Sequence, residues 1–329
     1  MGKVKILSID GGGIRGIIPA MVLAKIEQIT SKPICKLFDF ISGTSTGGIL
    51  ALSLTKPSAQ KKDMPEYSAN DIVNMYIQNG KKIFSSNILH KITSLNGLLD
   101  EKYCSAGIET VLREYLGSSK LSDCLTHVLI PSYELGLRKP FFFKSWNAKN
   151  PDKRNYDFFM WQVARATSAA PTYFEPFKLK TDIRDKVNYY SLIDGGVFAN
   201  NPAMCAFADA KVLFNDNDDI MMVSLGTGQL TKCIPYDKAK DWGLARWAKP
   251  ILDTIFDGES DTVDYQLKHL LKKNDYYRIQ ASLAQLGKDE MDDADDENIH
   301  ELKLLGQSLI EEWHASGKLD RLCSRLVVI

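Results

Sequence analysis

One stretch of the sequence, residues 38–48, constrains the fold of this chain more than any other. Its first half is an apolar run that predicts a buried strand, and the run stops at Gly43-Thr44-Ser45-Thr46-Gly47. Residues 49–55 then predict the apolar face of a helix. A strand, G-x-S-x-G and a helix form the context of a nucleophile elbow, in which the serine lies on a strained turn with its hydroxyl exposed. The pattern makes Ser45 a candidate nucleophile, and an ordinary glycine-rich turn is the alternative.

A second glycine turn lies near the start of the chain. Residues 4–9 predict a strand, which ends at Asp10-Gly11-Gly12-Gly13-Ile14-Arg15-Gly16, and residues 17–29 predict a helix. The pattern G-x-G-x-x-G between a strand and a helix is found in dinucleotide sites. However, the next strand ends in the serine turn and lacks a carboxylate for a ribose. Consecutive glycines also expose amides that converge on negative charge, so an oxyanion hole is the favoured interpretation.

The rest of the chain alternates between predicted strands and helices. Strands followed by glycine turns indicate a largely parallel sheet that is covered by helices on both faces. The last hundred residues are rich in helix, and no repeat or low-complexity linker divides the chain, so residues 1–329 are predicted to form one domain. Within it we expect a catalytic core of about 3–230 and a helix-rich part of about 231–329. Predicted strands cover 127–133, 141–146, 191–193, 220–225 and 276–280, and the later helices cover 105–115, 158–168, 241–256, 261–273 and 298–314.

Composition excludes several classes of protein. Lys plus Arg and Asp plus Glu both number 41, a balance that gives no reason to expect binding to nucleic acid. The six cysteines are scattered without a C-x-x-C pair, which indicates reduced thiols and no zinc site. No apolar run approaches the ~18 residues of a membrane span. We therefore predict a cytoplasmic protein without metal or cofactor, with peripheral membrane association or non-classical export left open.

A serine nucleophile needs a group that accepts its proton. Asp194 ends the predicted strand at 191–193, and Gly195 and Gly196 leave room beside it. In a parallel sheet the carboxyl ends of strands share one edge, so Asp194 is expected near Ser45 and Asp10. Burial of Asp194 would raise its pKa and make it a better base. The five histidines are His90, His127, His269, His300 and His314, and none of them lies on a glycine loop after a strand.

These motifs together resemble the patatin-like phospholipase family, whose members use a Ser–Asp dyad. The family's three motifs correspond to residues 10–16, 43–47 and 194–196, in the same order. The resemblance extends over nearly the whole chain and is nearest to the plant-type patatins. It implies a three-layer α/β/α sandwich with a mostly parallel central sheet. It also implies metal-free hydrolysis of fatty-acyl esters in phospholipids or galactolipids.

The resemblance also assigns roles to residues of this chain. Ser45 attacks the acyl carbonyl, Asp194 takes its proton, the Gly12 and Gly13 amides hold the oxyanion, and water then hydrolyses the acyl-enzyme. Arg15 supports the glycine loop, meets a head-group phosphate or forms a structural salt bridge. The remaining motif residues are expected to support this site: Gly11, Gly16, Gly43, Gly47, Gly195 and Gly196.

Partners and alternatives complete the expectations. The resemblance implies a membrane or lipid-aggregate substrate, which the protein contacts peripherally. Some bacterial relatives need an activator, so a requirement for one is left open. No oligomeric state is predicted.

One alternative function is a histidine-dependent hydrolase of small esters that uses His269, His300 or His314. Another is a nucleotide-binding module that uses residues 11–16. Residues 289–297 predict a solvated turn, and the apolar face of 242–256 predicts core more than a lid over lipid.

Overall fold

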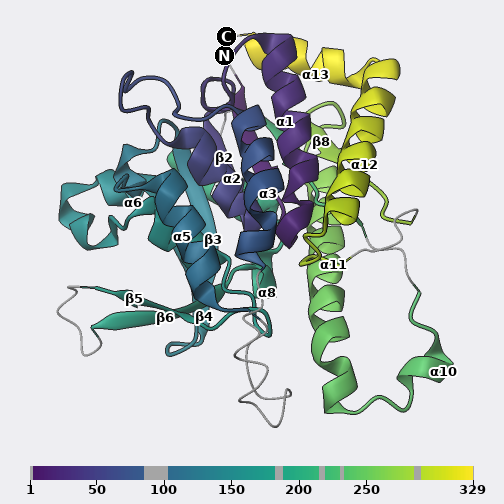
Figure 1. The fold of residues 1–329 in the computed structure, drawn as a ribbon. Coiled ribbons are helices and arrows are strands. Elements are labelled where there is room, and N and C mark those ends of the chain that lie inside the picture. Colours follow the sequence, from purple (N-terminus) through teal and green to yellow (C-terminus); the bar gives the residue numbers. More distant parts are fainter. Residues whose placement is uncertain are drawn as a thin grey trace.

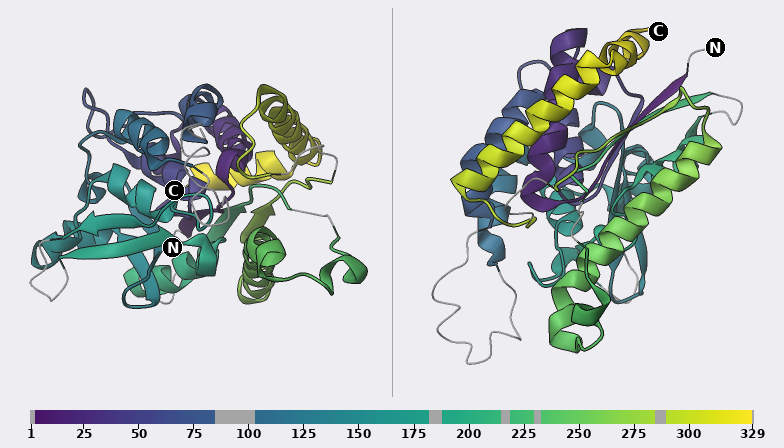
Figure 2. Two further views of the ribbon diagram at one scale, coloured as in Figure 1. Left: turned by 60° about the horizontal axis from the view of Figure 1, so that its bottom comes forward. Right: turned by 90° about the vertical axis from the view of Figure 1, so that its right-hand side faces the viewer.

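The computed structural model describes residues 3–84, 103–181, 188–214, 219–229, 233–284 and 290–328. One eight-stranded sheet lies between two layers of helices (Figures 1 and 2). Its strand order is β5-β6-β3-β2-β1-β7-β8, and β4 pairs with β3. The expected three-layer α/β/α sandwich is confirmed.

Five strands form the parallel part of the sheet, in the order β3-β2-β1-β7-β8. In register, Ile9 pairs with Gly43 on one side and with Leu225 on the other, so these strands end level with one another. The turns that follow them therefore share one edge of the sheet. The five strands are β1 (Val4–Ile9), β2 (Phe40–Gly43), β3 (His127–Glu134), β7 (Ile220–Leu225) and β8 (Tyr276–Ile279).

The other three strands are antiparallel: β4 (Lys139–Lys144), β5 (Phe177–Lys180) and β6 (Tyr189–Asp194). Only residues 135–138 separate β3 from β4, and a parallel crossover needs a dozen residues or more, so this connection is a hairpin. The sheet is therefore mixed, and the sequence pattern did not reveal the reversed direction of β6.

Alternate side chains of each strand enter different cores, as the pleat requires. On β1, Leu7 and Ile9 belong to one core and Val4 and Ile6 to the other. The first core lies under α1 (Ile17–Thr30), α2 (Thr46–Thr55), α3 (Ala69–Ile83), α5 (Ser105–Leu116), α7 (Met160–Thr167), α12 (Asp296–Ala315) and α13 (Lys318–Val327). The opposite layer contains α9 (Ala203–Leu213) and α11 (Leu244–Leu270). Short helices complete the chain: α6 (Ser145–Lys149), α8 (Gly196–Ala199) and α10 (Tyr236–Ala239).

The helix α11 differs from its prediction. Residues 241–256 and 261–273 were predicted as two helices, but one helix of 27 residues runs through both. An interior Gly258 costs about 1 kcal/mol relative to alanine. Packing overrides this cost, because Glu259 accepts from the Asn201 amide at 2.7 Å and Ser260 from Asn200 Nδ2 at 3.1 Å. None of the helices that the structure describes has the length and hydropathy of a membrane span.

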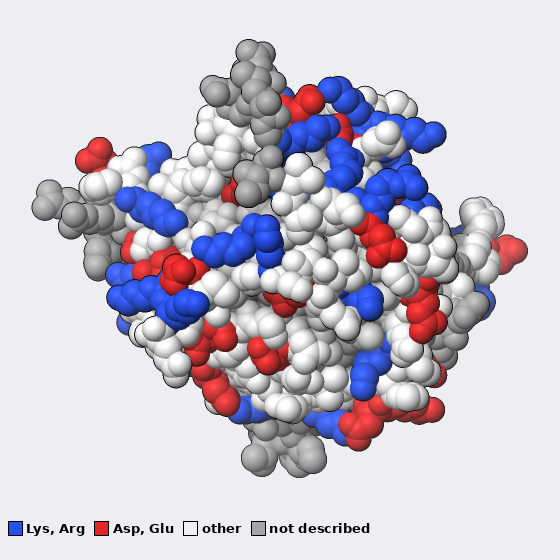
Figure 3. Space-filling model, turned by 90° about the horizontal axis from the view of Figure 1, so that it is seen from above, with Lys and Arg blue, Asp and Glu red and all other residues white. Residues whose placement is uncertain are grey.

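Charges on the surface are mixed in sign. Figure 3 shows one face of the molecule, on which acidic and basic side chains alternate, although basic ones are more frequent along one edge. The face drawn in Figure 3 therefore carries no continuous field of one sign for a polyanion. Salt bridges elsewhere among the described residues also pair the two signs, such as Lys272 with Asp219 at 2.9 Å and Lys81 with Asp296 at 2.7 Å.

Candidate active site

Ser45 lies on a strained turn between β2 and α2. Its φ and ψ are 55° and −122°, a conformation that L-residues rarely adopt and that typically costs about 1–3 kcal/mol. The turn closes only because its flanking glycines have no side chains. A Cβ on Gly43 would lie 2.0 Å from the Gly47 carbonyl oxygen, and one on Gly47 would lie 2.2 Å from the Ile9 oxygen. The Ser45 amide donates to Thr167 Oγ1 at 3.0 Å, which fixes the turn from the side.

The helix after this turn starts earlier than the sequence indicated. α2 begins at Thr46, directly after the serine, and all of its residues are buried. A helix that is buried on every side needs no polar face, which explains the uninterrupted apolar sequence. Its amino-terminal end, where the helix dipole is positive, points at Ser45.

Asp194 reaches Ser45 from the opposite direction. β2 pairs with β3 as far as Leu129, and β6 pairs with β3 from Ser132, opposite Asp194. β4 pairs with residues 129–134 along one edge of β3, so β2 and β6 must both pair with the opposite edge of β3. The two strands therefore meet head to head, and their ends bring Ser45 and Asp194 together. The prediction that Asp194 lies at this edge of the sheet was correct. However, the prediction assumed that β6 runs parallel to β2, and it does not.

The Asp194 carboxyl is almost completely buried, with 1% of its surface exposed. Its Oδ1 accepts from the Gly196 amide at 2.8 Å, and Ser45 lines the same pocket as this carboxyl. Burial raises the pKa of Asp194 to about 7, although the Gly196 amide and the nearby Ser45 hydroxyl oppose the shift. Gly195 permits the turn, since a Cβ there would lie 2.5 Å from the Pro131 carbonyl oxygen. A carboxyl with this pKa can both accept and return a proton near neutral pH.

The predicted oxyanion loop borders the same site. Gly13 has a left-handed φ of 59°, and a Cβ on it would lie 2.0 Å from the Met291 carbonyl oxygen. A Cβ on Gly12 would similarly meet Thr227 Oγ1 at 2.2 Å. Within the part of the chain that the structure describes, no hydrogen bond uses the amides of Gly12 or Gly13. These two donors are therefore available to a ligand.

The other residues of this loop support it. Gly11 donates its amide to the Asn200 carbonyl at 3.0 Å, and a Cβ on Gly16 would meet Thr46 Oγ1 at 2.3 Å. Arg15 is buried, and its Nε donates to the Gly12 carbonyl at 3.3 Å. Of the roles expected for Arg15, this contact favours support of the loop over contact with a head group. Asp10 is also structural, because Arg278 binds both of its carboxylate oxygens, at 3.0 and 2.6 Å.

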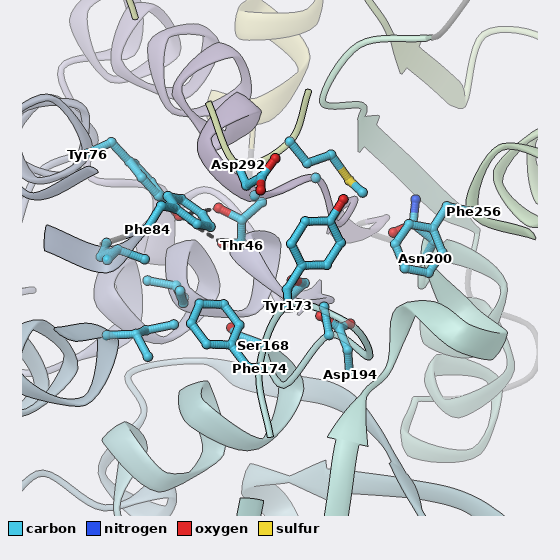
Figure 4. A pocket seen from close by; sticks show the side chains of 18 residues that line it. Thr46, Tyr76, Phe84, Ser168, Tyr173, Phe174, Asp194, Asn200, Phe256 and Asp292 are labelled. Atoms are coloured by element: carbon cyan, nitrogen blue, oxygen red, sulfur yellow. Dashed lines mark hydrogen bonds between the residues drawn. The ribbon is translucent and has the colours of Figure 1, made fainter. Parts of the chain in front are cut away.

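Figure 4 shows the pocket into which these groups face. Ser45, Asp194, Gly12 and Gly13 all line it. The remaining wall is mostly apolar or aromatic, and it includes Ile49, Tyr76, Ile83, Phe84, Ile108, Tyr173, Phe174, Phe256 and Met291. An apolar pocket with a few converging polar groups suits a ligand that joins a hydrocarbon part to a polar reacting group.

Several residues of the site were missed from the sequence. Asn200 and Ser168 line the pocket but had no assigned role. Residues 289–297 were predicted as a solvated turn, yet Met291 and Asp292 are buried and line the pocket too. Met291 accepts from the Ile14 amide at 2.8 Å, and Tyr103 donates to Asp292 at 2.6 Å. These contacts bring the segment over the glycine loop, an arrangement that carboxylate content alone could not indicate.

The histidines of the alternative mechanism lie elsewhere. His269, His300 and His314 are exposed on helices, and His127 packs against Trp146 and Phe214 at the opposite end of β3. None of these four lines the pocket, and His90 lies outside the described residues. The glycine loop of the nucleotide alternative borders the same mostly apolar pocket as Ser45 and Asp194, a lining that suits an acyl ester better than a nucleotide.

Comparisons with known proteins identify relatives of this chain. A family model described as "Patatin-like phospholipase" matches residues 7–207. Patatin-like protein 4 of Arabidopsis thaliana is 34% identical over 94% of this chain and 83% of its own length. Patatin-like protein 2 of the same plant is 34% identical over 98% and 86%. Among solved structures, VipD from Legionella pneumophila is 14% identical to this chain, with a TM-score of 0.36, over 94% of this chain and 67% of its own.

Proposed function

This chain belongs to the patatin-like phospholipase family, and from that premise we propose that it cleaves fatty-acyl esters of phospholipids or galactolipids through Ser45 and Asp194. The observation that carries the proposal is that Ser45 lines one pocket together with Asp194, a buried carboxyl whose pKa is about 7. A lipid acyl hydrolase needs such a pair next to an apolar pocket, and this pocket supplies the wall for an acyl chain.

In the proposed first step, Ser45 Oγ attacks the ester carbonyl while its proton moves to ionised Asp194. Negative charge develops on the carbonyl oxygen, and the unused amides of Gly12 and Gly13 are placed to bind it. Fixed donors of this kind typically contribute about 3–4 kcal/mol each to transition-state stability. Asp194 then returns the proton to the leaving alcohol, and the acyl group stays on Ser45.

In the second step, water attacks the acyl-enzyme and gives a proton to Asp194. The tetrahedral intermediate collapses when the bond to Ser45 Oγ breaks, and Asp194 protonates the serine again. The fatty acid leaves, and the enzyme returns to its starting state. One carboxyl serves as base and acid in both steps, which its pKa near neutrality allows.

Lipid is proposed to reach the site by peripheral contact. Ile251 and Ile255 lie one turn apart on α11 and are 45% and 40% exposed, so this part of the predicted core face is open. Phe256, the next residue, is buried and lines the catalytic pocket. Exposed apolar side chains beside a lipid pocket support contact with a lipid surface.

The test is release of fatty acid from vesicles of phosphatidylcholine and, separately, of galactolipid. We expect release by the wild type, none above background by Ser45→Ala, and a loss of at least about 10²-fold in Asp194→Asn. Ser324→Ala and Asp237→Asn, which change the same residue types on the exposed surface, should match the wild type. Full activity in Ser45→Ala would refute the proposed nucleophile.

A further inference from the structure

Asn200 has a buried acceptor without a partner in the catalytic pocket. Its side chain is 7% exposed, and among the described residues no hydrogen-bond donor reaches Oδ1. A methyl group placed on Gly11 would lie 2.4 Å from this Oδ1 and 3.3 Å from Ser45 Cβ, so both side chains border the same small space. Buried polar atoms normally have a partner, which indicates that a ligand or water supplies it here.

The orientation of Asn200 is fixed from several sides. Nδ2 donates to Ser260 Oγ on α11 at 3.1 Å, which directs Oδ1 away from that helix. The backbone is held as well, because the Asn200 carbonyl accepts from Gly11 at 3.0 Å and the Ala199 carbonyl accepts from Thr44 Oγ1 at 2.6 Å. Only the short helix α8 separates Asn200 from Asp194, so the two side chains enter the pocket from the two ends of one turn (Figure 4).

We propose that Asn200 is a positioning residue for the water that hydrolyses the acyl-enzyme, an inference that rests on the proposed function. The two nucleophiles of the reaction differ in their protons. Ser45 has one, and Asp194 accepts it. Water has two, so a single base leaves it free to rotate about one hydrogen bond, and a second acceptor fixes its lone pair toward the acyl carbon.

The proton balance limits this role to the second step. As water attacks, one proton moves to Asp194, and the other stays on the attacking oxygen, bound to Asn200 Oδ1, and leaves with the fatty acid. The bond from the acyl carbon to Ser45 Oγ then breaks, and Asp194 returns its proton to the serine. In the first step the leaving alcohol needs a donor, which is Asp194, and an acceptor such as Oδ1 offers it nothing.

The test separates the two steps with p-nitrophenyl butyrate under rapid mixing, together with intact mass of the quenched enzyme. In Asn200→Ala we expect a nitrophenol burst within about threefold of the wild-type rate. Steady turnover should fall by about 10- to 100-fold, the range that misplacement of a reacting group commonly costs. The butyryl-enzyme should accumulate, and hydroxylamine, a stronger nucleophile than water, should discharge it.

Two further variants keep the test decisive. Asn200→Asp retains an oxygen at the same place and should recover part of the turnover. Ser260→Ala removes only the anchor of Nδ2, lies outside the catalytic pocket, and should show the same pattern more weakly; it carries the test if Asn200→Ala does not fold. A burst slowed as much as turnover, or no added butyryl-enzyme in either variant, would overturn the proposal. A wild type without a Ser45-dependent burst would instead refute the proposed function itself.

Discussion

Asp194 must be ionised to accept the Ser45 proton, so the rate of acylation should follow the titration of this one carboxyl. With a pKa of about 7, as burial imposes, only about 1% of Asp194 is ionised at pH 5. The rate should therefore rise about tenfold per pH unit below neutrality and reach a plateau above pH 8, about a hundredfold higher than at pH 5. A carboxyl with the ordinary pKa of 3.8 would give a nearly flat profile over this range.

The same shift predicts a stability difference. A folded-state pKa raised from 3.8 to about 7 means that the folded protein holds the Asp194 proton more tightly than the unfolded chain. Stability is therefore lost as pH rises from about 4 to about 7, by roughly 4 kcal/mol at 1.36 kcal/mol per pKa unit. Asp194→Asn cannot ionise, so its free energy of unfolding should be similar to that of the wild type at pH 4. At pH 8 the variant should be more stable by up to about 4 kcal/mol.

The assay is the second-order rate of labelling by a fluorophosphonate from pH 5 to pH 9, with Ser45→Ala as the background. Denaturant unfolding of the wild type and Asp194→Asn at each pH gives the stability difference. Glu259, whose pKa burial raises to about 8, and Asp257, at about 6, also titrate in this range, but both are present in the two proteins and largely cancel. A labelling midpoint near pH 4, or a stability difference that does not change with pH, would show that the pKa of Asp194 is not raised.

Three more outcomes follow from the geometry. Gly13→Ala forces a Cβ against the Met291 carbonyl in a left-handed conformation, so we expect a lower melting temperature and loss of acylation in thermal melts and fluorophosphonate labelling. Arg278→Met leaves the Asp10 carboxylate buried without its partner and should cost about 3–5 kcal/mol in urea unfolding, whereas Arg278→Lys should cost less. Glu259→Gln keeps an acceptor for the Asn201 amide but removes a carboxyl whose raised pKa destabilises the fold as pH rises toward 8. This variant should keep the activity of the wild type and have a higher free energy of unfolding above pH 8. An unchanged free energy of unfolding above pH 8 would contradict the raised pKa of Glu259.

Local patterns sufficed for much of the fold and the site. β1 and β7 have the predicted bounds, and the turns at Ser45, Gly12 and Asp194 follow strands as expected. Each of these features depends on neighbours within a few residues, since an apolar run ends where glycines permit a tight turn. Such signals are present in one short segment and can be read there.

Features that depend on distant segments were not predictable in this way. The head-to-head meeting of β2 and β6 requires that β4 occupy the other edge of β3, and no pattern within β6 encodes its direction. The burial of Met291 over Gly13 and the anchoring of Asn200 by Ser260 join segments that lie far apart in the chain. α11 continues through Gly258 for the same reason, because its contacts with Asn200 and Asn201 outweigh a local preference.

Activation of Ser45 by Asp194 can be measured as the change in intact mass after fluorophosphonate treatment at pH 8. We expect one adduct on the wild type, mapped by peptide digestion to Ser45. Ser45→Ala should carry no adduct, and labelling of Asp194→Asn should be at least about 10²-fold slower although the variant is folded. An adduct on another residue would exclude Ser45 as the nucleophile, and wild-type labelling speed in Asp194→Asn would exclude Asp194 as its base.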